Sequence, residues 1–189
     1  MERPAPAIRP PVALGCTAIV AVALLSIFAL VLFLIFIQSG AAGGLAVLNP
    51  PAAYPPGSMQ YISDHNFYLS RLPDGSFVAL SDLDITNRAN PQHRCRVSRL
   101  DPGDPSLPQL VSQYGSRMSP QAAGSTTLLR EDCHGALYDF SGARLNGDGP
   151  NLDRLAVDVN GSGKVEVNYT KRACSQRDGA DVFAPIPCP

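Results

Sequence analysis

Tryptophan is absent from this chain of 189 residues, and histidine is scarce, with only three residues. Charged side chains make up 16% of the sequence, with 15 Lys and Arg against 16 Asp and Glu, and no run of basic residues occurs. Nucleic acid binding needs clustered positive charge, so nucleic acid is not expected as a partner. A phosphate loop, a dinucleotide-binding glycine fingerprint and a Gly-x-Ser-x-Gly elbow are all missing. We therefore predict no catalytic residues and no enzyme activity.

Proline and glycine are abundant instead, with 18 and 16 residues, which favours a loop-rich, mainly β domain. Short apolar runs at 66–72 and 76–80 flank Pro73-Asp74-Gly75, which predicts a hairpin. A second hairpin is predicted where apolar and polar residues alternate on both sides of Asn160-Gly161. The length allows one modest domain plus an extension.

The extension is apolar. Residues 11–37 carry no charge, and a helix of that length rises about 40 Å, more than the roughly 30 Å hydrocarbon core of a bilayer. We predict a single transmembrane helix at 11–38, in contact with the lipid bilayer. A cleaved signal peptide is the alternative, because Gly40-Ala41-Ala42 offers small residues, although its apolar region usually spans only about 7–15 residues.

The charges around this stretch predict its orientation. Arg3 and Arg9 precede it, and the next charge is Asp64. The positive-inside tendency then places residues 1–10 in the cytoplasm and the rest outside. A Gly/Ala/Pro-rich linker is predicted at 39–57, followed by an extracytoplasmic domain at 58–189.

Residues 129–159 carry a family resemblance. They are similar to the second cluster-binding loop, and the strands after it, of the Rieske iron–sulfur family. The matching positions are Cys133-His134-Gly135, Tyr138-Asp139, Gly142, Gly149-Pro150 and 152–159. The run 76–81 is similar to the strand that enters the family's first cluster loop. The resemblance covers roughly 66–167 and implies a small antiparallel β-sandwich head. Respiratory Rieske subunits likewise have a transmembrane helix, a short hinge and an extracytoplasmic head.

The cluster ligands are where the sequence departs from the family. A Rieske centre needs two cysteines and two histidines, but the cysteine position of the second loop is Glu131, and of that pair only His134 remains. In the first loop, one register places Asn90 and Gln92 at the ligand positions. A second register, which resembles the cluster-free small subunit of assimilatory nitrite reductase, places Asp84 and Thr86 there. Carboxylates and amides are harder donors than thiolates, so we expect a degenerate, cluster-free site with no cofactor.

The alternative is that other residues bind a metal or a cluster. His93, Cys95, Cys133 and His134 contain the right number of each donor for a metal or a [2Fe-2S] cluster, but in the wrong order. Adjacent residues on an extended chain point to opposite sides, so Cys133 and His134 do not converge easily.

The resemblance also implies a disulfide. In respiratory Rieske proteins an extra cysteine in each loop joins the two loops, and these positions are Cys95 and Cys133. Cys174 and Cys188 then suggest a second bridge that fixes the C-terminal tail, with Cys16 left in the membrane. The sequence leaves other connectivities open.

Two further features predict no specific function. Residues 100–128 are rich in Pro, Ser, Gly and Gln and predict a surface insertion, with a short strand or helical turn at 109–114. The carboxylates of Asp82, Asp84, Glu131 and Asp132 offer oxygen ligands for a hard cation, but a solvated acidic patch is favoured.

Together these features predict a non-catalytic, cluster-free, Rieske-like accessory subunit that binds integral membrane subunits of a larger complex. By family analogy this complex is a respiratory or photosynthetic electron-transfer assembly. The alternative function is a Rieske [2Fe-2S] electron carrier with an unusual ligand set.

Overall fold

The computed structural model describes residues 13–38, 44–84, 95–177, 183–186 and 188. The chain divides into two compact units, Met1–Gly43 and Gly44–Pro189. In the first unit, α1 (Ala13–Gln38) is a helix of 26 residues, and side-chain environments within it are described for 22–34. Within the part of the chain that is described, no helix combines the length and hydropathy that a membrane span requires. The span at 11–38 stays a prediction.

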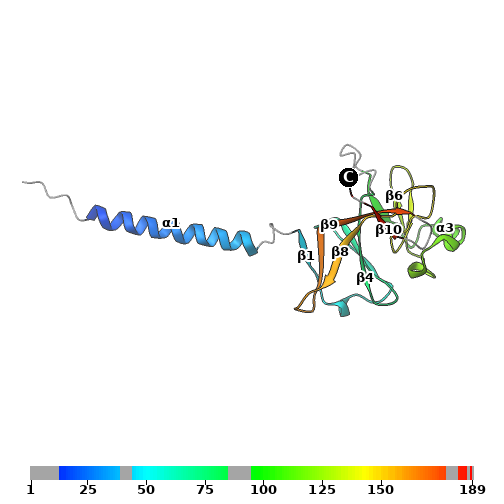
Figure 1. Ribbon diagram of the computed structural model, residues 1–189, viewed down its shortest axis with the longest axis horizontal. Helices are drawn as coiled ribbons and strands as arrows, with labels where there is room; N and C mark the ends of the chain where they lie inside the picture. Colours follow the sequence, from blue (N-terminus) through cyan, green and yellow to red (C-terminus); the bar gives the residue numbers. More distant parts are fainter. Residues whose placement is uncertain (1–12, 39–43, 85–94, 178–182, 187, 189) are drawn as a thin grey trace, which may run out of the picture. The chain divides into compact units, whose positions relative to one another are not determined.

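The second unit, called the head below, is mainly β, as predicted, and contains a seven-stranded antiparallel sheet (Figure 1). Its path is β1-β9-β8-β4-β3-β2, and β10 pairs with β9 off this path. The strands are β1 (Leu45–Val47), β2 (Met59–Ile62), β3 (Phe67–Arg71), β4 (Phe77–Ser81), β8 (Arg154–Val159), β9 (Val165–Arg177) and β10 (Phe183–Ile186).

A second, three-stranded sheet has the order β5-β6-β7, with β5 (Val97–Arg99), β6 (Leu128–Glu131) and β7 (Leu137–Asp139). Between β5 and β6 the chain forms α3 (Leu107–Tyr114) and two short 3₁₀ turns, η2 (Gly115–Arg117) and η3 (Pro120–Ala122). A further turn, η1 (Pro51–Ala53), follows β1.

The predicted hairpins both occur. β3 pairs with β4 from Phe67↔Ser81 to Arg71↔Phe77, and β8 pairs with β9. In the second hairpin the Asn160 side chain accepts hydrogen bonds from the backbone N–H of Ser162 (3.0 Å) and Lys164 (3.1 Å). These hydrogen bonds stabilise the turn. The left-handed backbone conformation in this turn occurs at Gly163, whose φ is 75°.

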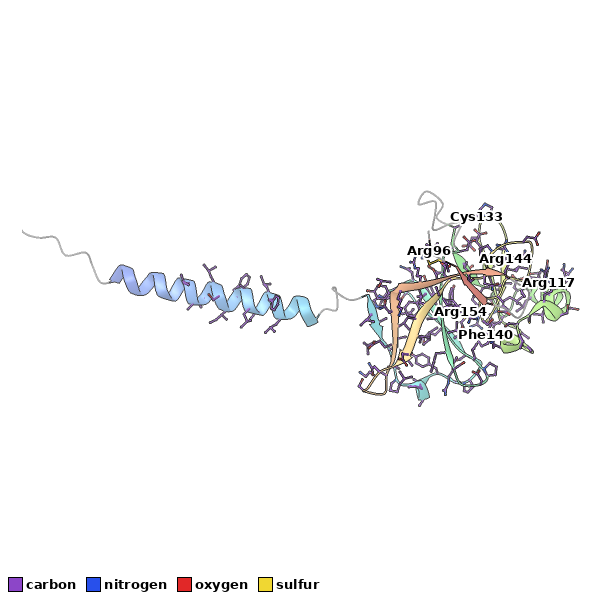
Figure 2. All side chains as sticks on the ribbon, viewed as in Figure 1. Arg96, Arg117, Cys133, Phe140, Arg144 and Arg154 are labelled. Carbon is purple, nitrogen blue, oxygen red and sulfur yellow. A yellow bond between two sulfur atoms is a disulfide. The ribbon has the colours of Figure 1, made fainter. Side chains whose placement is uncertain are left out.

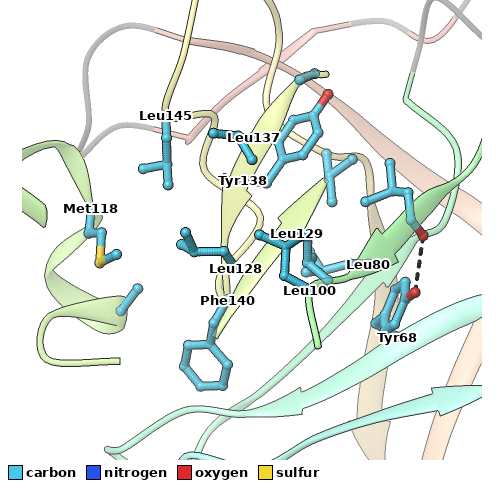
Figure 3. Close-up of a cluster of buried hydrophobic side chains, with 14 of the residues drawn as sticks. Tyr68, Leu80, Leu100, Met118, Leu128, Leu129, Leu137, Tyr138, Phe140 and Leu145 are labelled. Carbon is cyan, nitrogen blue, oxygen red and sulfur yellow. Dashed lines mark hydrogen bonds between the residues drawn. The ribbon is translucent and has the colours of Figure 1, made fainter. Parts of the chain in front are cut away.

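Strands β3 and β4 are buried on both faces because two hydrophobic cores lie on opposite sides of them. Phe67 and Leu69 of β3 pack in a core formed by strands of the large sheet together with Tyr54 after η1. Tyr68, between them, points the other way into a core to which both sheets contribute (Figure 3). Its hydroxyl donates to the carbonyl oxygen of Val97 at 3.0 Å and so links the two sheets. The alternation of side chains along a strand produces this arrangement.

Two predicted boundaries need correction. The segment 39–57 was predicted as a linker, but Ala46 of β1 and Tyr54 are buried in the head, so the folded unit begins at Gly44. The segment 100–128 was predicted as a surface insertion, yet Leu107, Met118 and Ala122 belong to the core between the sheets. In both segments a few buried side chains, separated by polar and proline residues, pack the chain against the head.

Candidate functional site

The candidate site lies where β6 ends and the chain turns into β7. Cys95, just before β5, forms a disulfide with Cys133 in this turn, with a Cα–Cα distance of 5.5 Å. Beside the disulfide, the backbone N–H of Asp132 donates to the carbonyl oxygen of Arg96 at 3.0 Å. Figure 2 marks Arg96 and Cys133 at this end of the head. The two segments that resemble cluster loops are therefore joined covalently and by hydrogen bonds.

Glu131 is the last residue of β6, and its side chain is fully buried. Its two carboxylate oxygens accept hydrogen bonds from the next turn of the chain: Oε1 from the backbone N–H of Cys133 (2.9 Å) and Oε2 from that of His134 (2.6 Å). The Nδ1 atom of His134 lies 3.5 Å from Oε2. Glu131 thus organises the loop from within, with charge-assisted hydrogen bonds.

The same turn is closed on its other side by Asn146. Its side-chain amide donates to the carbonyl oxygen of Gly135 (2.8 Å) and accepts from the backbone N–H of Leu137 (2.7 Å). Gly135 has φ of +71°, a conformation that favours glycine. The Cys133-His134-Gly135 sequence is therefore held in one conformation from both sides.

A second polar cluster lies beside the disulfide, at the end of β4. Arg96 forms an ion pair with the buried carboxylate of Asp82, which also accepts a hydrogen bond from the Tyr61 hydroxyl at 3.0 Å. Asn66 accepts hydrogen bonds from both Arg96 (3.1 Å) and Tyr61 (3.2 Å). Burial, and after it the hydrogen bond to Asp82, raises the pKa of Tyr61, and the same carboxylate raises the pKa of Arg96.

A third interaction links Asp84 to the strand after the turn. The Tyr138 hydroxyl donates to Asp84 Oδ2 at 3.4 Å. Burial, and secondarily the negative charge of Asp84, raises the pKa of Tyr138 well above its usual value. Both side chains are buried.

The acidic patch predicted from the sequence is not a solvated one. Asp82, Asp84 and Glu131 are buried, and only Asp132 is exposed. Each buried carboxylate accepts hydrogen bonds from different donors, which offset the cost of removing its charge from water. The sequence identified these carboxylates but not their partners Arg96, Tyr61 and Asn66. No local pattern marks them, because they come from separate strands and turns.

Several predicted positions lie outside the described residues: Thr86, Asn90, Gln92 and His93. The structure therefore does not test the first-loop ligand positions or the part of the alternative metal set that uses His93.

The described donors do not fit the thiolate and imidazole set of a Rieske cluster. Cys95 and Cys133 are bonded to each other, and Glu131 turns its carboxylate to its own loop. The chemistry of the remaining sequence-assigned positions, two amides or a carboxylate and a hydroxyl, is equally unlike Cys and His. Even so, ligand atoms of Cys95, Glu131 and Cys133 lie within 4.8 Å of one another.

The head has two further features, a second disulfide and a cavity. The second disulfide joins Cys174 in β9 to Cys188, with a Cα–Cα distance of 5.2 Å, so the tail is attached to the large sheet. A cavity of about 570 Å³ opens beside α3. Its lining is mostly apolar and includes Leu100, Leu107 and Val111, with Arg99 as the charged residue.

No protein-family model and no curated protein matches this chain. Among solved structures, the chain is similar to one assigned as the small subunit of an NADH-dependent nitrite reductase from Mycobacterium tuberculosis. The sequence identity is 16%, the TM-score is 0.33, and the match covers 65% of this chain and 92% of that chain. A likeness of this strength does not establish a family.

Proposed function

We propose that this chain is a non-catalytic accessory subunit of a larger membrane complex of the electron-transfer type, with a Rieske-like head that binds no [2Fe-2S] cluster. The observation that supports the proposal most strongly is the pair of hydrogen bonds that the Glu131 carboxylate accepts. Its buried carboxylate holds the loop in which a cluster would be gripped, through the N–H groups of Cys133 and His134. The loop has an internal acceptor in place of a thiolate ligand.

The disulfide supports the same conclusion. It joins the two loops covalently, so the end of the head keeps its shape with no metal between them. In the chain-entropy model a closed loop of this size contributes about 3–4 kcal/mol to the free energy of unfolding. A head without a redox centre transfers no electrons, which leaves binding as its role.

The membrane anchor is proposed from the sequence. Residues 11–37 are uncharged, and in the described part of α1 the large apolar side chains are exposed, among them Leu24, Phe28 and Phe33. Side chains of this kind are stable against lipid tails. With Arg3 and Arg9 in the cytoplasm, the head lies on the opposite side of the membrane.

The cavity beside α3 is the surface we propose for the partner subunit. Its apolar walls, formed by Leu100, Leu107 and Val111, suit an apolar side chain of another protein. The variant Val111→Asp places a charge in that wall and should remove the partner from the complex.

Two measurements test the proposal. The full chain, extracted in mild detergent, should contain neither iron nor acid-labile sulfide and should give no electron-paramagnetic signal after reduction. Detection of iron and sulfide near two atoms each per chain would overturn it in favour of an electron carrier with unusual ligands.

The docking step is tested by comparing variants. A complex isolated with the wild-type chain should be lost with Val111→Asp and kept with Val159→Asp, which changes an exposed apolar residue of β8 outside the cavity. Equal retention by both variants would refute the cavity as the docking surface.

A further inference from the structure

Donor atoms of three residues gather at the end of β6, and a fourth donor, His134, lies beside one of them. One ligand atom each from Cys95, Glu131 and Cys133 lies within 4.8 Å of the others, and Nδ1 of His134 lies 3.5 Å from the Glu131 carboxylate. Cys95 and Glu131 are buried, whereas the His134 side chain is 61% exposed and has room to rotate. Two sulfurs, one oxygen and one imidazole nitrogen are the donor types of zinc sites.

The spacing suits a small tetrahedral cation. Zinc binds sulfur at about 2.3 Å and nitrogen or oxygen at about 2.0–2.2 Å, which places the ligand atoms of a tetrahedron roughly 3.3–3.8 Å apart. The ligand atoms of Cys95, Glu131 and Cys133 lie within 4.8 Å of one another, about 1 Å more than the widest of these separations. The site proposed below requires side-chain rotation to close this difference and to bring in the His134 imidazole.

The state of the cysteines controls whether these ligands are available. In the structure the two sulfurs are bonded to each other and offer no thiolate. The carboxylate, by contrast, is already oriented, because the N–H groups of Cys133 and His134 fix both of its oxygens. Hydrogen bonds of this kind orient ligands in metal sites.

We propose that reduction of the Cys95–Cys133 disulfide creates a site for a zinc-type divalent cation, held by both thiolates, the Glu131 carboxylate and the His134 imidazole. A dithiol of the thioredoxin class supplies two electrons and two protons and is itself oxidised to a disulfide. The Sγ–Sγ bond breaks and two thiols form. The cation then replaces both thiol protons, which pass to solvent.

This site differs from a Rieske centre in its other ligands, although His134 is a ligand position in both. It uses the two cysteines of the disulfide, no bridging sulfide, and a carboxylate as ligand. The proposed site does not depend on the proposed accessory function. That function belongs to the oxidised head, whose bonded cysteines offer no thiolate to a cation.

The test uses Co²⁺ as a spectroscopic probe for zinc. The full chain in detergent is reduced with a phosphine and titrated with Co²⁺. We expect one ion per chain, with thiolate-to-cobalt charge-transfer absorption and the visible bands of a tetrahedral ion, both reversed by Zn²⁺. The oxidised chain should show none of these signals. Their absence from the reduced wild type would overturn the proposal.

Matched variants assign the ligands. Reduction also frees Cys174 and Cys188, so the double variant Cys95→Ser/Cys133→Ser is titrated under the same conditions and should lose the charge-transfer bands. Glu131→Gln, which keeps both cysteines, should weaken binding about tenfold or more. Unchanged bands in the double variant, or unchanged affinity in Glu131→Gln, would refute the assignment.

One measurement needs no variant. X-ray absorption of the zinc-loaded reduced wild type should show two sulfur and two nitrogen or oxygen ligands. Four sulfur ligands would mean that the other cysteines contribute, and would equally refute the site.

Discussion

Replacement of Glu131 by alanine tests how far the loop depends on its internal carboxylate. The change removes the acceptor for the N–H groups of Cys133 and His134, which lie 2.9 and 2.6 Å from its oxygens. It leaves the disulfide and both strands in place. Alanine also occupies less volume at a position that is completely buried.

The expected loss in the free energy of unfolding follows from these two hydrogen bonds. A hydrogen bond to a charged group contributes about 1.5–3 kcal/mol, so two give about 3–6 kcal/mol. Water can reach the turn, since Cys133 and His134 are exposed, and it replaces part of the loss. We expect the free energy of unfolding to fall by about 2–4 kcal/mol. Glu131→Gln keeps one carbonyl acceptor and should cost about half as much.

The assay is urea unfolding of the oxidised full chain in detergent, followed by far-ultraviolet circular dichroism. Asp132→Asn is the matched control: this neighbour is exposed and accepts from the Ser98 hydroxyl at 3.0 Å. It should change the free energy of unfolding by less than about 0.5 kcal/mol. If Glu131→Ala stays within the same limit, the carboxylate does not hold the loop, and the proposed function loses its main support.

Two further predictions concern the core. Burial raises the pKa of Tyr138, so the folded protein keeps the phenol proton above pH 10, where the unfolded chain loses it. The free energy of unfolding should therefore fall as pH rises above about 10, and Tyr138→Phe should reduce that slope by up to about 1.4 kcal/mol per pH unit; an unchanged slope contradicts this. Gly142 has φ of +89°, and an added Cβ would lie 2.6 Å from Leu80 Cδ2. Gly142→Ala should cost about 2–5 kcal/mol in urea unfolding, against less than about 1 kcal/mol for Gly161→Ala, which has open space and no positive φ; equal costs would refute the reasoning.

Much of the head could be predicted because its signals are local. Pro73-Asp74-Gly75 sits between two apolar runs, and Asn160 precedes a polar turn, so both hairpins follow from neighbouring residues. The first strand was missed because β1 buries only Ala46, too small a side chain to mark a strand against its Gly- and Pro-rich surroundings.

The candidate site was predicted only in part. Glu131 was identified as a departure from a resembling family, which gives its position but not its hydrogen bonds. Arg96 and Asn146 carried no signal in the sequence, because the residues that they contact lie 14 and 11 positions away along the chain. The direction in which a buried carboxylate points depends on the donors around it.

The sequence by itself determined the apolar N-terminal segment and the two hairpins, since each of these is a property of neighbouring residues. Only the tertiary structure decided that 44–57 and 100–128 pack into the head, and that Glu131 faces its own loop beside the joined sulfurs of Cys95 and Cys133. These arrangements depend on contacts between residues far apart in the chain, whose energies are set by burial and by the few polar partners that burial leaves available.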